Sequence, residues 1–257
     1  MAFQPLNMQS LVKFNYALSS NLLDVFENAL DGYILNSSKA KPSKTFAPSS
    51  MRCERISWFR LRGVDPDGES VPDRGLDFTA KMGVACHEYV QSLLSQTPYW
   101  VNVSEYIKTI FSESDYHINI SQYETQISLT SPPIRFACDG ILNLQDNLSL
   151  LEIKSCSHSS FVDLTDPKPE HVYQAKGYCT LLKLSKILFL YIDRWYGDIK
   201  VYEVCVTEND KQSILNMFSR VLDCVDNRIA PQPLPKGDRW CNASMCNYYK
   251  KCSEYGR

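Results

Sequence analysis

Charged residues interrupt an apolar strand pattern in the middle of the chain. Residues 148–155 carry Glu152 and Lys154 among leucine and isoleucine, and Asp139 lies one predicted hairpin earlier. Side chains two residues apart leave the same face of a strand, so Glu152 and Lys154 point to one side. Charged groups in such a strand are costly unless they pair with each other or bind a metal ion. The pattern predicts a sheet with a polar site; the alternative is an amphipathic strand with a surface salt bridge.

The residue types indicate which chemistry this polar site would support. Carboxylate oxygens of Asp139 and Glu152 suit a hard cation such as Mg2+ or Mn2+. Such an ion lowers the pKa of a bound water and neutralises charge on a phosphoryl group. A lysine beside it, here Lys154, orients the attacking water or stabilises the transition state.

The remaining periodicity is that of an α/β domain with a small mixed sheet flanked by helices. We expect a helical N-terminal extension and linker over 1–48, with helical spacing at 10–35 and a polar, proline-containing linker at 36–50. The main domain would then cover 49–257. Its expected helices are 53–62, 76–96, 169–184 and 208–229. Its expected strands are 123–129, 135–144, 148–155, 186–193 and 201–206.

Composition is that of a folded globular protein. The chain has 257 residues, of which 44% are hydrophobic and 22% charged, and this excludes disordered, collagen-like and coiled-coil classes. The net charge of −2 means that nucleic-acid binding would depend on local basic patches. The N-terminus lacks the pattern of a signal peptide, and no apolar run is long enough to span a membrane, so we expect a cytoplasmic protein without a membrane partner.

Four cysteines have the distribution of a metal site. Cys241, Cys246 and Cys252 cluster near the C-terminus, and Cys53 is the candidate fourth ligand. Four thiolates complete the coordination of a soft metal centre and would close a loop of roughly 190 residues. Zinc sites usually use short C-x2–4-C pairs. One pair here fits that range, so we favour an iron–sulfur cluster and keep Zn2+ as the alternative. The other six cysteines are expected to be ordinary thiols.

The order of these motifs resembles the PD-(D/E)XK nuclease superfamily, which has a restriction-endonuclease-like core. Asp139 corresponds to its first acid, with Cys138 in place of the usual proline, and Glu152-x-Lys154 corresponds to its acid–lysine pair. Gln174-x-x-x-Tyr178 matches the QxxxY element of the RecB-type members.

Further matches specify the subgroup. Gly83-x-x-x-His87 matches the histidine of RecB-type nucleases, and Glu124 matches an acid often present on the first strand. One upstream cysteine followed by three downstream is similar to the iron–sulfur subgroup, which includes the CRISPR-adaptation four-cysteine exonuclease and the AddB nuclease domain. In that subgroup a 4Fe–4S cluster joins the N- and C-terminal segments of the domain.

The resemblance implies a role for each matching residue. The metal ion would be held by His87, Asp139, Glu152 and the backbone carbonyl of Ile153. Lys154 would act in the transition state, Glu124 would be a further active-site acid, and Gln174 and Tyr178 would orient the lysine or the DNA. The 4Fe–4S cluster would be held by Cys53, Cys241, Cys246 and Cys252.

Basic residues flank both cysteine segments. They include Arg52, Arg55, Arg60, Lys250 and Lys251, interleaved with aromatic residues such as Trp58, Phe59 and Trp240. Lysine and arginine bind phosphates, and exposed aromatic rings stack on bases. We expect a DNA-binding surface here. The alternatives are a solvated basic face and aromatic residues that belong to the core.

These features together predict a Mg2+- or Mn2+-dependent deoxyribonuclease of DNA processing, recombination or repair. We expect an exonuclease that acts on DNA ends or single strands. The chain has no P-loop motif, so an unwinding helicase would be a separate protein. Two other classes stay open: a catalytically silent module that binds nucleic acid or a partner, and a zinc-stapled RNA nuclease.

Overall fold

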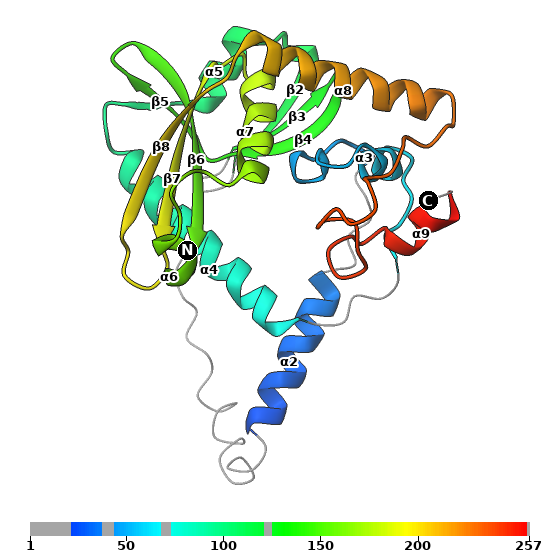
Figure 1. The fold of residues 1–257 in the computed structure, drawn as a ribbon. Coiled ribbons are helices and arrows are strands. Elements are labelled where there is room, and N and C mark those ends of the chain that lie inside the picture. The colour runs from blue at the N-terminus through cyan, green and yellow to red at the C-terminus, as the bar shows by residue number, and fades with distance from the viewer. Residues whose placement is uncertain (1–21, 38–43, 68–72, 121–124, 256–257) are drawn as a thin grey trace. The chain divides into compact units, whose positions relative to one another are not determined.

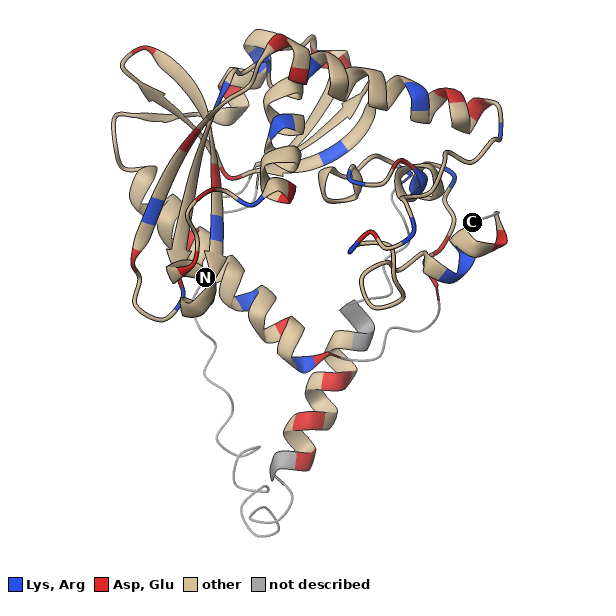
Figure 2. Cartoon of the chain, in the orientation of Figure 1, with Lys and Arg blue, Asp and Glu red and all other residues tan. Residues whose placement is uncertain are grey.

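The computed structural model describes residues 22–37, 44–67, 73–120 and 125–255 in two compact units (Figure 1). The smaller unit contains α2 (Leu22–Ser37) and the first residues of α4 (Arg74–Leu94). Within it, Arg74 forms ion pairs with Glu27 and Asp31, each at 2.8 Å. Figure 2 shows acidic residues and no basic ones on the described part of α2. Residues 10–21 of the expected helical region lie outside the described residues, and the boundary expected at 48 stays a prediction.

A five-stranded mixed sheet forms the centre of the larger unit, as the strand pattern predicted. Its order is β1-β5-β6-β7-β8, and β6 and β7 are parallel while the other pairs are antiparallel. A parallel pair needs a crossover connection, which α6 (His158–Val162) and α7 (Pro169–Leu181) provide. The strands are β1 (Trp100–Val101), β5 (Gly140–Leu144), β6 (Asn147–Cys156), β7 (Lys186–Asp193) and β8 (Ile199–Cys205).

A second, three-stranded antiparallel sheet corrects one expectation. The single strand expected over 135–144 is wrong, because the chain forms β4 (Pro133–Cys138) in this sheet and β5 in the other. The break falls at Asp139, whose side chain accepts from the backbone of Ile153 in β6 and whose carbonyl accepts from Gln91 of α4. The remaining strands of this sheet are β2 (Tyr116–Ile120) and β3 (Thr125–Thr130).

The helices of the larger unit agree closely with the helical periodicity. The expected helices over 53–62, 169–184 and 208–229 correspond to α3 (Glu54–Leu61), α7 and α8 (Glu208–Asp226). Thr207 and Asp210 form a capping box that starts α8. Sequence periodicity missed α5 (Val103–Ile110) and α9 (Tyr249–Glu254), which are short helices of eight and six residues.

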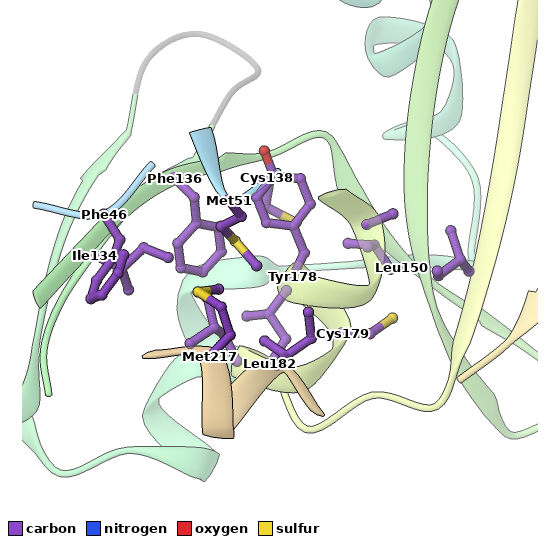
Figure 3. Packing of buried hydrophobic residues seen from close by; sticks show 14 of the residues in the cluster. Phe46, Met51, Ile134, Phe136, Cys138, Leu150, Tyr178, Cys179, Leu182 and Met217 are labelled. Atoms are coloured by element: carbon purple, nitrogen blue, oxygen red, sulfur yellow. The ribbon is translucent and has the colours of Figure 1, made fainter. Parts of the chain in front are cut away.

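The segment before α3 belongs to the core and is not a linker. Phe46 is fully buried, and its backbone bonds to Pro133 and Arg135 of β4. Its ring packs edge-on against Phe218 of α8 at a centroid distance of 4.8 Å. Figure 3 shows Phe46 beside Ile134 and close to Met217. The linker expected over 36–50 is therefore wrong for its second half. The segment is mostly polar, but its one phenylalanine, Phe46, anchors it in the core.

Helices cover both faces of the central sheet. Alternate residues of β6 enter different cores: Leu150 packs on the side of α7 and α8, and Leu151 packs with Val90 of α4. A strand buried on both faces reads as a continuous apolar run, which explains the sequence around Glu152. In the part of the chain that the structure describes, no helix is long and apolar enough to cross a membrane.

Candidate active site

Asp139 lies where the chain passes from the three-stranded to the five-stranded sheet. Its Oδ2 accepts a hydrogen bond of 2.8 Å from the backbone N–H of Ile153, and its carbonyl accepts one of 2.8 Å from Gln91. The residue is 8% exposed. The bond to Ile153 fixes the carboxylate against β6, the strand that carries Glu152.

Glu152 and Lys154 share one face of β6, as expected, and form an ion pair of 2.6 Å between Oε1 and Nζ. The alternative of a surface salt bridge is wrong, because the Glu152 side chain is 3% exposed and that of Lys154 is 19% exposed. Burial raises the pKa of Glu152 to about 7; the charge of Lys154 opposes this shift and the charge of Asp139 adds to it. A second cation near Glu152 would therefore favour its ionised form, as Lys154 already does.

His87 reaches the same place from α4. Its Nδ1 lies 3.1 Å from Oδ1 of Asp139. Burial by itself lowers the pKa of His87, but the hydrogen bond and charge of Asp139 outweigh it, so the pKa is raised above its ordinary value. Gln91 follows one turn later on the same helix, and its side chain is buried against Asp139. His87 therefore lies beside Asp139, while its role as a metal ligand stays a prediction.

Gln174 and Tyr178 extend a hydrogen-bond chain from α7. The Gln174 Oε1 accepts from Lys154 Nζ at 3.5 Å, and its Nε2 donates to the Tyr178 hydroxyl at 2.9 Å. Tyr178 is 6% exposed and stacks on Phe136 of β4. Burial raises the pKa of the Tyr178 hydroxyl, so it remains neutral. This geometry matches the expected contact with the lysine, whereas the catalytic role of both residues stays a prediction.

Two residues of this neighbourhood were missed in the sequence. Gln91 stands four residues after His87, a spacing that places both on one helix face and could have indicated it. His171 precedes Gln174 by three residues and bonds through Nδ1 to the Tyr191 hydroxyl at 2.8 Å. Burial, with a contribution from the charge of Lys154, lowers the pKa of His171 to about 4. Glu124 lies outside the described residues.

The side chains fit a hard divalent cation by their chemistry. Asp139 and Glu152 offer carboxylate oxygens and His87 an imidazole nitrogen. Asp139 is adjacent both to His87 and to the backbone of Ile153, whose carbonyl remains a predicted ligand. As placed, these groups bond mainly to one another: among the described residues, no three His, Cys, Asp or Glu side chains converge closely enough to hold a metal ion.

The four predicted cysteine ligands line one cavity. Cys53 lies at the start of α3, and Cys241, Cys246 and Cys252 come from the C-terminal segment. Cys53, Cys246 and Cys252 are buried, and Cys241 is half-buried. The structure thus brings the remote segments together, while a metal centre in this cavity stays a prediction.

The predicted DNA contact of Arg55 is wrong, because this side chain is buried. Arg55 is 3% exposed and bonds to the carbonyl of Pro231 at 2.6 Å and to the carbonyl and sulfur of Cys252 at 3.3 and 3.5 Å. A guanidinium enclosed in this way joins the two segments and does not face a phosphate. Lys251 also has an internal role, because its Nζ bonds to the carbonyls of Asp65 and Pro66.

The other basic residues around the cysteines are mixed with acidic and aromatic groups. Lys250 is exposed, and the guanidinium of Arg52 lies 4.5 Å from the ring centre of Trp240. Trp58 and Phe59 are buried in the core, which confirms the core alternative for these two rings. Figure 2 shows basic and acidic residues interleaved around α3 and α9. DNA contacts by Arg52, Arg60 and Lys250 stay predictions.

No protein-family model matches the chain, and no curated protein matches its sequence. Among solved structures, SSO0001 is similar with a TM-score of 0.46 and 15% identity, covering 86% of this chain and 93% of its own. The alkaline exonuclease LHK-Exo from Laribacter hongkongensis has a TM-score of 0.45 and 12% identity, covering 78% of this chain and 93% of its own. With both scores below 0.5, neither likeness assigns this chain a family or a function.

Proposed function

We propose that this chain is a metal-dependent nuclease that hydrolyses phosphodiester bonds in DNA. The observation that carries the proposal is the buried unit of Asp139, Glu152 and Lys154, with His87 in contact with Asp139. Burying two carboxylates side by side is costly unless cations compensate for them. Lys154 compensates for one carboxylate in the structure, and a divalent cation held by Asp139, Glu152, His87 and the Ile153 carbonyl would compensate for both.

The bound cation would supply Lewis-acid stabilisation of the phosphoryl oxygens and a more acidic water. The protein groups around it would position the reactants. Asp139 is held by the Ile153 N–H, so its second oxygen keeps a fixed direction toward His87. Lys154 is held between Glu152 and Gln174, which places an ammonium beside the carboxylates. That ammonium would orient the attacking water or stabilise charge on the phosphate.

We further propose that Cys53, Cys241, Cys246 and Cys252 hold a structural 4Fe–4S cluster. Their common cavity, walled also by Phe59 and Tyr248, is a support for this proposal. The guanidinium of Arg55 lies against Cys252 and would offset part of the thiolate charge. A zinc ion at the same four residues is the competing occupant, and analysis of iron, sulfide and zinc in anaerobically purified protein distinguishes the two.

A digest of matched DNA and RNA substrates tests the nuclease assignment. We expect the wild type to degrade single-stranded DNA and DNA ends with Mg2+ or Mn2+, and Asp139→Asn and Glu152→Gln to lose cleavage while they remain folded. Asp146→Asn is the matched control, since Asp146 is an exposed acid in the β5–β6 turn, six residues from Glu152 along the chain. Undiminished cleavage by either active-site variant would refute the site. Degradation of RNA but not DNA would refute the DNA assignment, and no cleavage at all would favour a binding module.

A further inference from the structure

A second group of polar and aromatic side chains lies at one end of the central sheet, outside the candidate active site. Asp193 ends β7, His158 begins α6, and Trp195 and Tyr196 lie in the turn between β7 and β8. Figure 1 shows α6 and this turn at the same end of the sheet. The mechanism proposed above uses none of these residues.

Asp193 organises this group. Its side chain is fully buried; Oδ2 lies 2.6 Å from Nδ1 of His158, and Oδ1 accepts from the backbone N–H of Trp195 at 2.9 Å. Those contacts lower the pKa of Asp193 although burial opposes the shift, so the carboxylate remains charged. Nδ1 of His158 faces Asp193, and the His158 side chain is 47% exposed, so the imidazole remains accessible from solvent.

The two aromatic side chains of the turn are exposed, and the backbone bonds that close the turn do not require them. Trp195 is 79% exposed, the highest value among the large apolar residues that the structure describes, and Tyr196 is 67% exposed. The turn is closed by backbone bonds between Asp193 and both Gly197 and Asp198, with Gly197 at a φ of +75°. None of these bonds involves the aromatic side chains. The Tyr196 ring packs edge-on against His158 at 4.7 Å, which places the imidazole and an aromatic ring together.

Strand register connects this group to the candidate active site. Lys154 pairs with Tyr191, and Cys156 pairs with Asp193, so all four side chains leave the same face of the sheet. Helix α7 and its N-cap residue cover this face as far as Tyr191, whose hydroxyl bonds to His171 and Lys168. The Asp193 position lies beyond that cover, four residues or about 13 Å along the strand from Glu152.

We propose that His158, Trp195 and Tyr196 bind single-stranded nucleic acid beside the candidate active site, with a phosphate at His158 and bases stacked on the exposed rings. The inference rests on the proposed nuclease function and specifies which form of substrate approaches the site. Exposed aromatic rings bind bases that are free to stack, which a single strand offers and an intact duplex does not. A strand held here lies at the end of the sheet that α7 leaves uncovered, about 13 Å along the strand direction from Glu152.

Binding measured separately from cleavage tests this inference. The probe is a fluorescein-labelled octathymidine, compared with a labelled blunt hairpin duplex, by fluorescence anisotropy in EDTA. We expect Trp195→Ala to weaken octathymidine binding about fivefold or more, as expected for the loss of one stacked base. His158→Asn should also weaken it, and it keeps a hydrogen-bond donor for the buried Asp193. Affinity for the duplex should change less than twofold in both variants.

Tyr99→Ala is the matched control, because Tyr99 is 52% exposed and precedes β1 at the opposite edge of the sheet. Octathymidine binding within twofold of wild type by folded Trp195→Ala and His158→Asn would overturn the inference, as would equal losses for the duplex or no binding by the wild type. Cleavage by the wild type distinguishes the two proposals. If the protein cleaves DNA but octathymidine binding does not depend on Trp195, this inference alone is refuted. If binding depends on Trp195 but the protein does not cleave, the nuclease function alone is refuted.

Discussion

The buried carboxyl of Glu152 should make the metal-free protein less stable as the pH rises. Its pKa is raised from 4.5 to about 7 in the folded protein, mainly by burial. Below pH 4.5 the carboxyl is protonated in both the folded and the unfolded chain, and its contribution to stability is fully present. Between that pH and about 7 the unfolded chain releases its proton first, so the free energy of unfolding falls. Above pH 7 the loss is complete.

The expected magnitude follows from the size of the pKa shift. Each pKa unit corresponds to about 1.4 kcal/mol, so a shift from 4.5 to about 7 predicts a loss of about 3 kcal/mol. The assay is urea unfolding of wild type and Glu152→Gln in EDTA at several values between pH 4 and pH 8. Because glutamine does not titrate, the difference between the two proteins reports the titration of Glu152 together with its charge interaction with His87. We expect the wild type to lose about 3 kcal/mol relative to the variant over this range.

Control measurements make this prediction specific. Glu203→Gln removes another carboxylate of the same sheet, but this one is exposed and paired with Lys186 at 2.9 Å, so its difference from wild type should be small and flat with pH. Mg2+ should reduce the loss at pH 8, because a cation beside Glu152 favours its ionised form. A constant difference between wild type and Glu152→Gln from pH 4 to pH 8 would refute the reasoning.

Three further predictions concern the lysine, the cysteines and the buried arginine. Lys154→Ala should lower the cleavage rate by at least about tenfold while the Mg2+ dependence stays nearly unchanged, as a metal titration of the rate will show. Cys53→Ser should remove the bound metal and much of the thermal stability, whereas Cys205→Ser, an exposed thiol, should do neither; metal analysis and thermal melts measure both. Arg55→Ala should destabilise the fold by about 2–4 kcal/mol in urea unfolding because it removes a buried guanidinium that bonds to Pro231 and Cys252, and should leave the salt dependence of DNA binding unchanged.

Local patterns predicted the parts of the site that lie on regular elements. The two-residue spacing of Glu152 and Lys154 on a strand fixes a common face, and the four-residue spacing of Gln174 and Tyr178 on a helix does the same. Both pairs are in contact in the structure. The same reasoning could not place Asp139 correctly, because the break between β4 and β5 depends on bonds to residues that are distant in the sequence.

The burial of individual side chains is the property that the sequence predicts least well. Arg55 and Lys251 look like phosphate ligands in a sequence rich in basic residues, yet their cationic groups bond to carbonyls of the segments that they join. Phe46 looks like part of a polar linker, yet it is fully buried. In each case the deciding partner lies far along the chain, so no local window contains the information.

The same argument applies to the contact between Asp193 and His158, which no local sequence pattern predicts. They are 35 residues apart, and neither belongs to a recognisable motif. The parallel pairing of β6 with β7 brings the residue that follows β6 close to the end of β7, where the buried carboxylate meets the imidazole. The crossover through α6 and α7 therefore has two consequences: α7 supplies Gln174 to the lysine, and α6 supplies His158 to Asp193. One topological feature thus places both the candidate catalytic group and its neighbouring aromatic group on a single face of the sheet.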